Sequence, residues 1–103
     1  MELITYRGVM DGLDLYPADK ALECYVFGLV SEAGEVAGKM KKLARGDDVK
    51  KETIIQELGD VLWYLDRLAK YFNYQIADLA GINHDKLVRR QQEGTLRGDG
   101  DSR

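Results

Sequence analysis

The chain has 103 residues, of which 45% are hydrophobic and 32% charged, with a net charge of −3 at neutral pH. This length fits one domain over residues 1–103, and the composition excludes a disordered or membrane-spanning chain, so no membrane partner is expected. A pI of about 5.1 argues against a nucleic-acid partner, while a single cysteine and an N-terminus without a secretory pattern favour the cytoplasm.

The first elements in chain order are two helices of unequal length. Residues 3–10 predict a short helix, and residues 1–17 together form an N-terminal helix and loop. After Pro17, apolar residues recur in steps of three and four, which predicts a long amphipathic helix over residues 18–45. Gly46 then suits the left-handed position that ends a helix.

The second half of the chain continues the helical pattern. Asp47 or Asp48 is expected to open a second long helix over residues 50–72. Residues 76–92 predict a broken fourth helix, and the glycine-rich residues 93–103 predict a mobile tail. No segment has the alternation of a strand. The fold class is therefore all-α, with the two long helices packed antiparallel.

Two short acidic segments repeat within the two long helices. Residues 31–36 read SEAGEV and residues 56–61 read QELGDV, each with two acids three positions apart. On a helical wheel both pairs lie to the same side of the apolar seam, so an antiparallel pair of helices gathers four carboxylates along one edge. The four acids are Glu32, Glu35, Glu57 and Asp60.

Four carboxylates beside a core raise one another's pKa and oppose folding unless a cation neutralises them. Ligands that offer only carboxylate oxygen favour a hard divalent ion, Mg²⁺ first, with Mn²⁺ as a common substitute. A single such pair is commonplace on helix surfaces, but two pairs in one register favour a metal site over a solvated acidic face.

Other residues of these helices carry more open interpretations. Lys39 can pair with an acid one turn away or contact phosphate, and Tyr64 can either contact substrate or cap the core. Trp63 falls on the opposite flank, where packing, including packing between subunits, is expected. Gly34 and Gly59 point away from the acids and predict a close helix–helix approach.

The segments SEAGEV and QELGDVLWYL resemble those of the MazG-like family of all-α nucleoside triphosphate pyrophosphohydrolases. The wider superfamily includes all-α dUTPases and phosphoribosyl-ATP pyrophosphatases. Its E-x-x-E and E-x-x-D signature is matched by the four acids, and a later N-x-x-K-x-x-x-R segment is matched by Asn83, Lys86 and Arg90. The resemblance runs from about Ala21 to the end, and the first residues match only loosely.

This resemblance implies cleavage of a nucleoside triphosphate to a monophosphate and pyrophosphate, with Mg²⁺. It also implies a homodimer or homotetramer, in which the long helices contribute to a four-helix core, in a bacterial or phage-infected cytoplasm. Water attack is expected because no Ser–His or Cys–His pair is evident.

Residue roles can be carried over in the same way. Glu32 and Glu35 are the candidate catalytic bases as well as metal ligands, and the expected substrate contacts are Lys39, Tyr64, Asn83, Lys86 and Arg90. The basic C-terminal segment is expected to bind the triphosphate, and the tail, with Arg97 and Arg103, is expected to close over it. Two alternatives stay open: a non-catalytic helical module that binds nucleotide or protein, and a relative specific for dUTP or phosphoribosyl-ATP.

Overall fold

The computed structural model describes residues 1–94, which form helices and connecting loops without a strand. This confirms the all-α prediction. The helices are α1 (Leu3–Asp11), α2 (Ala21–Ala44), α3 (Lys51–Tyr71) and α4 (Ile76–Gln92). None of the described helices is both long and apolar enough to cross a bilayer. The predicted tail falls largely on residues 95–103, which lie outside the described residues.

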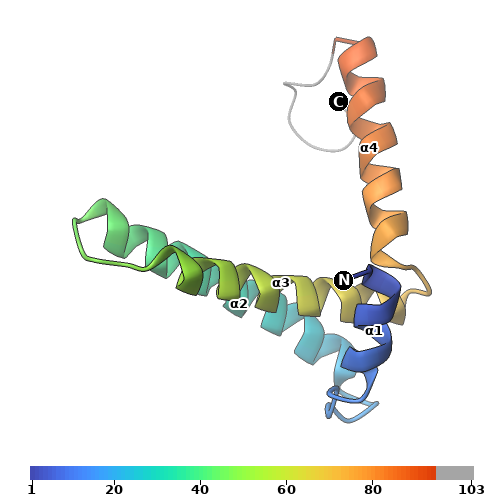
Figure 1. The fold of residues 1–103 in the computed structure, drawn as a ribbon. Coiled ribbons are helices and arrows are strands. Elements are labelled where there is room, and N and C mark those ends of the chain that lie inside the picture. Colours follow the sequence, from blue (N-terminus) through green and yellow to red (C-terminus); the bar gives the residue numbers. More distant parts are fainter. Residues whose placement is uncertain (95–103) are drawn as a thin grey trace.

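Helices α2 and α3 lie side by side as an antiparallel hairpin (Figure 1). Gly46 ends α2 as predicted, with a left-handed φ of +94° and an N–H that donates to the Leu43 carbonyl at 3.0 Å. The predicted capping by Asp47 or Asp48 is wrong, because α3 begins at Lys51. Asp47 instead accepts a hydrogen bond of 2.8 Å from the Arg45 guanidinium within the connecting loop.

Two other helix boundaries differ from the prediction. The Lys20 N–H donates to the Pro17 carbonyl at 3.0 Å, so a single turn precedes α2 and the helix starts three residues later than expected. Helix α4 is continuous rather than broken. Its start is fixed by a hydrogen bond of 2.8 Å from the Gln75 N–H to the Asp78 carboxylate, and glycine within a helix costs only about 1 kcal/mol.

Helix α1 is fastened to the C-terminal half of α3 by buried charged residues. The Arg7 guanidinium donates to the Asp66 carboxylate at 2.9 Å and to the Tyr74 carbonyl at 2.8 Å. The Arg67 guanidinium pairs with Asp66 at 2.5 Å and with Asp11 at 2.9 Å. This network sets the position of the N-terminal loop that follows α1. The sequence predicts the general amphipathic pattern of these helices but not these pairings.

The chain has an open shape with little apolar core of its own. Helix α1 lies at one end of the α2–α3 hairpin, and helix α4 projects away from that same end (Figure 1). The Cα radius of gyration is 16.5 Å, against about 13 Å for a compact domain of this length. Among the described residues the buried hydrophobic side chains are Ala21, Tyr25 and Ala69.

Candidate metal centre

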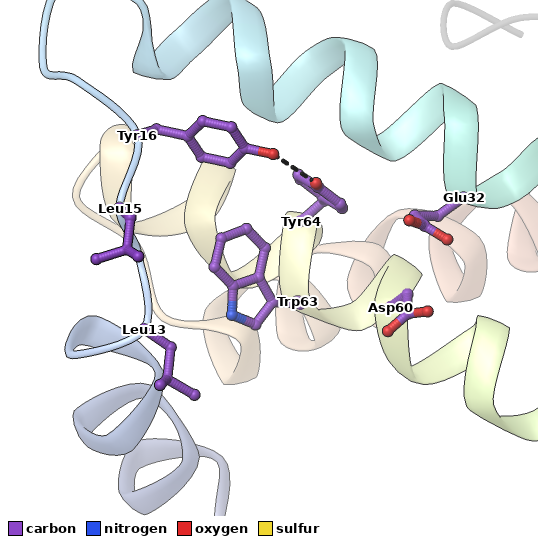
Figure 2. A pocket seen from close by; sticks show the side chains of 7 residues that line it. All are labelled: Leu13, Leu15, Tyr16, Glu32, Asp60, Trp63 and Tyr64. Atoms are coloured by element: carbon purple, nitrogen blue, oxygen red, sulfur yellow. Dashed lines mark hydrogen bonds between the residues drawn. The ribbon is translucent and has the colours of Figure 1, made fainter.

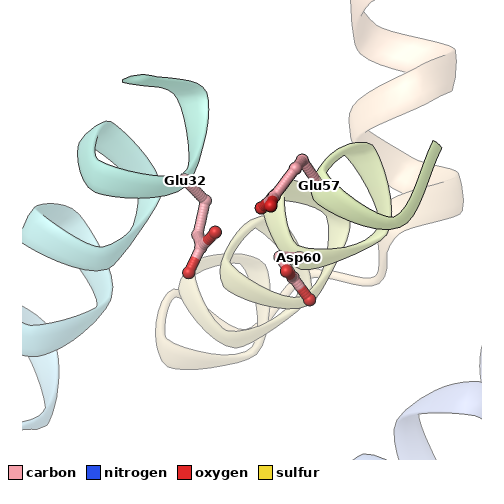
Figure 3. Close-up of side chains that lie close together, drawn as sticks. All are labelled: Glu32, Glu57 and Asp60. Atoms are coloured by element: carbon pink, nitrogen blue, oxygen red, sulfur yellow. The ribbon is translucent and has the colours of Figure 1, made fainter. Parts of the chain in front are cut away.

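Three of the four predicted acids meet across the α2–α3 hairpin. Glu32 on α2 and Glu57 and Asp60 on α3 each offer a carboxylate oxygen, and these oxygens lie within 4.8 Å of one another (Figure 3). Glu32 and Glu57 are half-buried, while Asp60 is exposed. We refer to these three residues as the acidic trio.

The local fold explains why the trio forms. Glu57 and Asp60 are three positions apart on a continuous helix, so they share one face. The antiparallel partner places Glu32 against that face, in the register expected from the two matched apolar seams. The geometry therefore follows from helix periodicity and from the short connection between the long helices.

Glu35 is not part of this trio. It lies one helical turn beyond Glu32 on α2, and its side chain is exposed. The expectation that all four acids form one site stays a prediction for Glu35.

The trio carries electrostatic strain that a cation would relieve. Burial raises the pKa of Glu32 above its usual 4.5, and the nearby Glu57, Asp60 and Glu35 carboxylates raise the pKa further. The Lys39 ammonium lies 3.7 Å from Glu57 across the hairpin and supplies one positive charge. This pairing differs from the expected contact with an acid on its own helix.

The donor set fits a hard divalent ion. All three groups are carboxylates, and the chain's only histidine and cysteine contribute nothing to the trio. Oxygen donors without nitrogen or sulfur suit Mg²⁺ or Mn²⁺ rather than zinc. His84 lies on α4, where its ring is 3.0 Å from Asp85, and Cys24 is a half-buried free thiol on α2.

Beside the trio lies a pocket with a volume of about 490 Å³, a size usual for small-molecule sites. Glu32 and Asp60 form one end of it, and Trp63 and Tyr64 from α3 line it further along (Figure 2). The loop after α1 lines the other end of this open pocket. Its contributing residues are Leu13, Leu15 and Tyr16. We call this space, with its three aromatic rings, the aromatic pocket.

One sequence expectation changes here. Trp63 does not lie on the flank opposite the acids but lines the same pocket as Asp60, one helical turn away. Tyr64 lines the pocket too, and its hydroxyl is 2.8 Å from that of Tyr16. The role of residues 13–16 was not foreseen, because nothing in a loop of mixed apolar and acidic residues predicts which helix it will cover.

The expected close approach at Gly34 and Gly59 is also wrong within this chain. A Cβ atom at either position would meet nothing within 4 Å. The close approach occurs at Gly28, where a Cβ would lie 2.1 Å from a ring atom of Tyr64. Gly28 therefore lets the Tyr64 ring lie against α2 at the edge of the aromatic pocket.

The predicted phosphate-binding residues of α4 lie apart from the trio in the single chain. Asn83, Lys86 and Arg90 belong to the helix that stands off the hairpin (Figure 1). Asn83 is exposed, Lys86 is half-buried and Arg90 is buried. Arg97 and Arg103 fall outside the described residues.

The sequence model of the MazG nucleotide pyrophosphohydrolase domain matches residues 21–95. The chain belongs to the MazG family. The match begins at the first residue of α2 and includes the whole acidic trio, whereas α1 and the loop that lines the aromatic pocket precede it. The chain is also similar to the Gene 37 protein of Mycobacterium phage L5, at 36% identity over 89 residues, covering 82% of this chain and 78% of that protein. No solved structure matches this chain.

Proposed function

We propose that this MazG protein is a Mg²⁺-dependent hydrolase that converts a nucleoside triphosphate to the monophosphate and pyrophosphate. The observation that supports the proposal most strongly is the acidic trio, whose carboxylate oxygens lie within 4.8 Å of one another. Two members of the trio line a pocket large enough for a nucleotide. The family match to a nucleotide pyrophosphohydrolase domain agrees with this arrangement.

Glu32, Glu57 and Asp60 would hold the ion, and we propose Glu35 as the fourth acid of the site. A bound Mg²⁺ would neutralise phosphate charge and lower the pKa of a coordinated water. Mn²⁺ has the same preference for carboxylate oxygen and would serve as a substitute.

The chain's own residues would orient the substrate and accept a proton. We propose Lys39, held beside Glu57, as a cation for the phosphates. The proton acceptor is one of the two acids of α2, Glu32 or Glu35, acting on a water molecule, because no nucleophilic serine or cysteine lies in the trio or in the pocket lining. Tyr64, in the pocket wall, is the proposed contact to the sugar or base.

Product analysis tests this proposal. The protein is incubated with Mg²⁺ and a panel of nucleotides that includes dUTP and phosphoribosyl-ATP, and the products are followed by phosphorus NMR. A monophosphate and pyrophosphate are expected, and Asp60→Asn should abolish their formation with helical content unchanged. Release of inorganic phosphate and a diphosphate would contradict the proposed bond cleavage. Nucleotide binding without turnover would favour the non-catalytic module instead.

A further inference from the structure

We propose that the aromatic pocket holds the nucleobase of the substrate, and that the loop over residues 13–16, which precedes the family's matched region, forms its outer wall. This inference rests on the proposed function, because it assigns the part of the nucleotide that extends along the pocket from phosphates held at the acidic trio. It also places determinants of base preference in a segment outside residues 21–95.

The two ends of the pocket differ in chemistry. Glu32 and Asp60 occupy one end, and the aromatic rings with Leu13 and Leu15 occupy the other (Figure 2). A nucleoside triphosphate also has two chemically different ends. Its phosphate chain needs a cation, and its planar base needs apolar surface. A triphosphate bound through a cation at the acidic end would therefore direct its base toward the rings.

The rings contact one another along the pocket. The Trp63 and Tyr64 ring centroids are 5.0 Å apart and nearly perpendicular, at 83°. The Tyr16 ring lies 6.3 Å from that of Trp63 and 5.9 Å from that of Tyr25. The Arg67 guanidinium also lies over the Trp63 ring, 5.5 Å from its centroid. Rings held in place by such contacts bind a base with little loss of conformational freedom.

The position of the loop is fixed by buried polar contacts. The Tyr25 hydroxyl donates to the Asp14 carboxylate, and Asp14 lies 3.6 Å from the buried Arg67 guanidinium. Asp14 sits between Leu13 and Leu15, so these contacts fix the backbone at both leucines, which line the pocket with exposed side chains. The Tyr16 hydroxyl pairs with that of Tyr64 at 2.8 Å and closes the wall.

Trp63 makes the proposal directly measurable, because it is the only tryptophan of the chain. Its fluorescence is followed during titration with α,β-methylene nucleoside triphosphates, which resist the proposed cleavage, in the presence of Mg²⁺. Inorganic tripolyphosphate is the matched probe without a base. We expect strong quenching by the nucleotide analogues and little change with tripolyphosphate. Equal responses to the two probes would overturn the proposal.

Variants of the loop supply the second comparison. Tyr16→Ala should weaken binding of the nucleotide analogue about tenfold, the order expected for loss of one stacking ring, and should leave tripolyphosphate binding by calorimetry unchanged. Tyr74→Ala, which removes an exposed ring outside the pocket, is the control and should change neither affinity. A Tyr16→Ala variant that binds the analogue normally, or that loses both probes equally, would contradict the assignment.

These outcomes separate the two proposals. Hydrolysis to pyrophosphate without any effect of the base would retain the proposed function and remove the pocket assignment. Base-dependent quenching in a protein that hydrolyses no nucleotide would retain the pocket assignment and remove the proposed function.

Discussion

Gly28 shows how a single residue sets the shape of the pocket. The Tyr64 ring fills the space that any side chain at position 28 would occupy, since a Cβ there would lie 2.1 Å from the ring. The hydroxyl of that ring is 2.8 Å from the Tyr16 hydroxyl. The absence of one methyl group on α2 therefore determines where the wall of the aromatic pocket stands.

Substituting Gly28→Ala should displace Tyr64 and lower the free energy of unfolding by about 1–3 kcal/mol, the usual cost of overpacking. It should also raise KM for the nucleotide. Gly34→Ala is the matched control, because its Cβ would meet nothing within 4 Å and alanine favours a helix by up to about 1 kcal/mol. Urea unfolding of both variants checks this, and a stabilised Gly28→Ala variant would contradict the packing described.

Tyr25 gives a second prediction for a single residue, on pH dependence. Burial and the neighbouring Asp14 raise the pKa of its phenol from 10.0 to about 12. The unfolded chain would ionise first as pH rises, so stability from this residue is complete below the unfolded pKa and is lost through the folded one. The free energy of unfolding should therefore fall between about pH 10 and 12. Tyr25→Phe should show a shallower fall over that range, and an identical slope in both proteins would refute the attribution.

Single residues also mark the limit of sequence reasoning. Periodicity places Glu32, Glu57 and Asp60 on facing helix surfaces, so their meeting could be predicted. The position of Trp63 could not, because its flank depends on how far the two helices rotate about their axes. That rotation is set by contacts such as Tyr64 against Gly28, which no helical wheel contains.

At the scale of helices and loops, buried charged residues join α1 to α3. Asp66 accepts from Arg7 and from Arg67, and all three side chains are almost completely buried. Through this one carboxylate, α1 is joined to α3, and Arg67 extends the network to Asp11. The N-terminal loop and hence the pocket wall depend on it.

Asp66→Ala should lower the free energy of unfolding by about 3–5 kcal/mol, because it leaves two guanidinium groups buried without their shared partner. The control is Asp85→Ala, at an exposed position on α4, which should cost less than about 0.5 kcal/mol. Thermal and urea unfolding measure both. Similar stability for the two variants would show that the buried network contributes little.

At this scale the sequence predicted the described helices but not all of their ends. The step of three and four residues is a strong signal over a long helix, so α2 and α3 were placed within a few residues. Their starts depend on local hydrogen bonds, such as that from Lys20 to Pro17 and that from Arg45 to Asp47. The same loop residues could provide hydrogen-bond partners for these backbone and side-chain groups in several ways. The sequence therefore does not predict which hydrogen bonds form at the helix starts.

At the scale of the whole molecule, both helices of the hairpin leave large apolar side chains exposed. On α2, Tyr25 is buried within the chain, whereas Phe27 and Val30 are exposed at 70% and 67%. On α3, Ile55 and Leu58 are exposed at 58% and 48%. We therefore propose a homodimer or homotetramer in which the two hairpins form a four-helix core.

Sedimentation at micromolar concentration should show a species of at least twice the chain mass of 11.6 kDa. Phe27→Glu should shift it toward the monomer by placing a charge in the contact, while Glu23→Gln, an exposed position on the same helix, should not. A stable monomer of the unaltered chain would contradict the proposed assembly.

The same assembly accounts for the residues of α4. Since α4 projects away from its own hairpin, we propose that the exposed Asn83 and the half-buried Lys86 contact a triphosphate bound to another chain. Asp60→Asn and Lys86→Ala proteins should then each lose activity alone and recover part of it when mixed and reassembled. Absence of recovery, with subunit exchange demonstrated, would count against this arrangement.

Metal binding by the acidic trio is the central claim, and a Mn²⁺ titration followed by electron paramagnetic resonance tests it most directly. The unaltered protein should show saturable binding that Mg²⁺ displaces. Glu57→Gln should weaken that binding by at least roughly 10- to 100-fold, the range for loss of an outer-shell partner, because it removes a proposed ligand itself. Glu52→Gln, which removes an equal charge from an exposed position on the same helix, should leave it unchanged. Equal Mn²⁺ binding by the Glu57→Gln and Glu52→Gln proteins would show that the trio is an acidic surface and not a metal site.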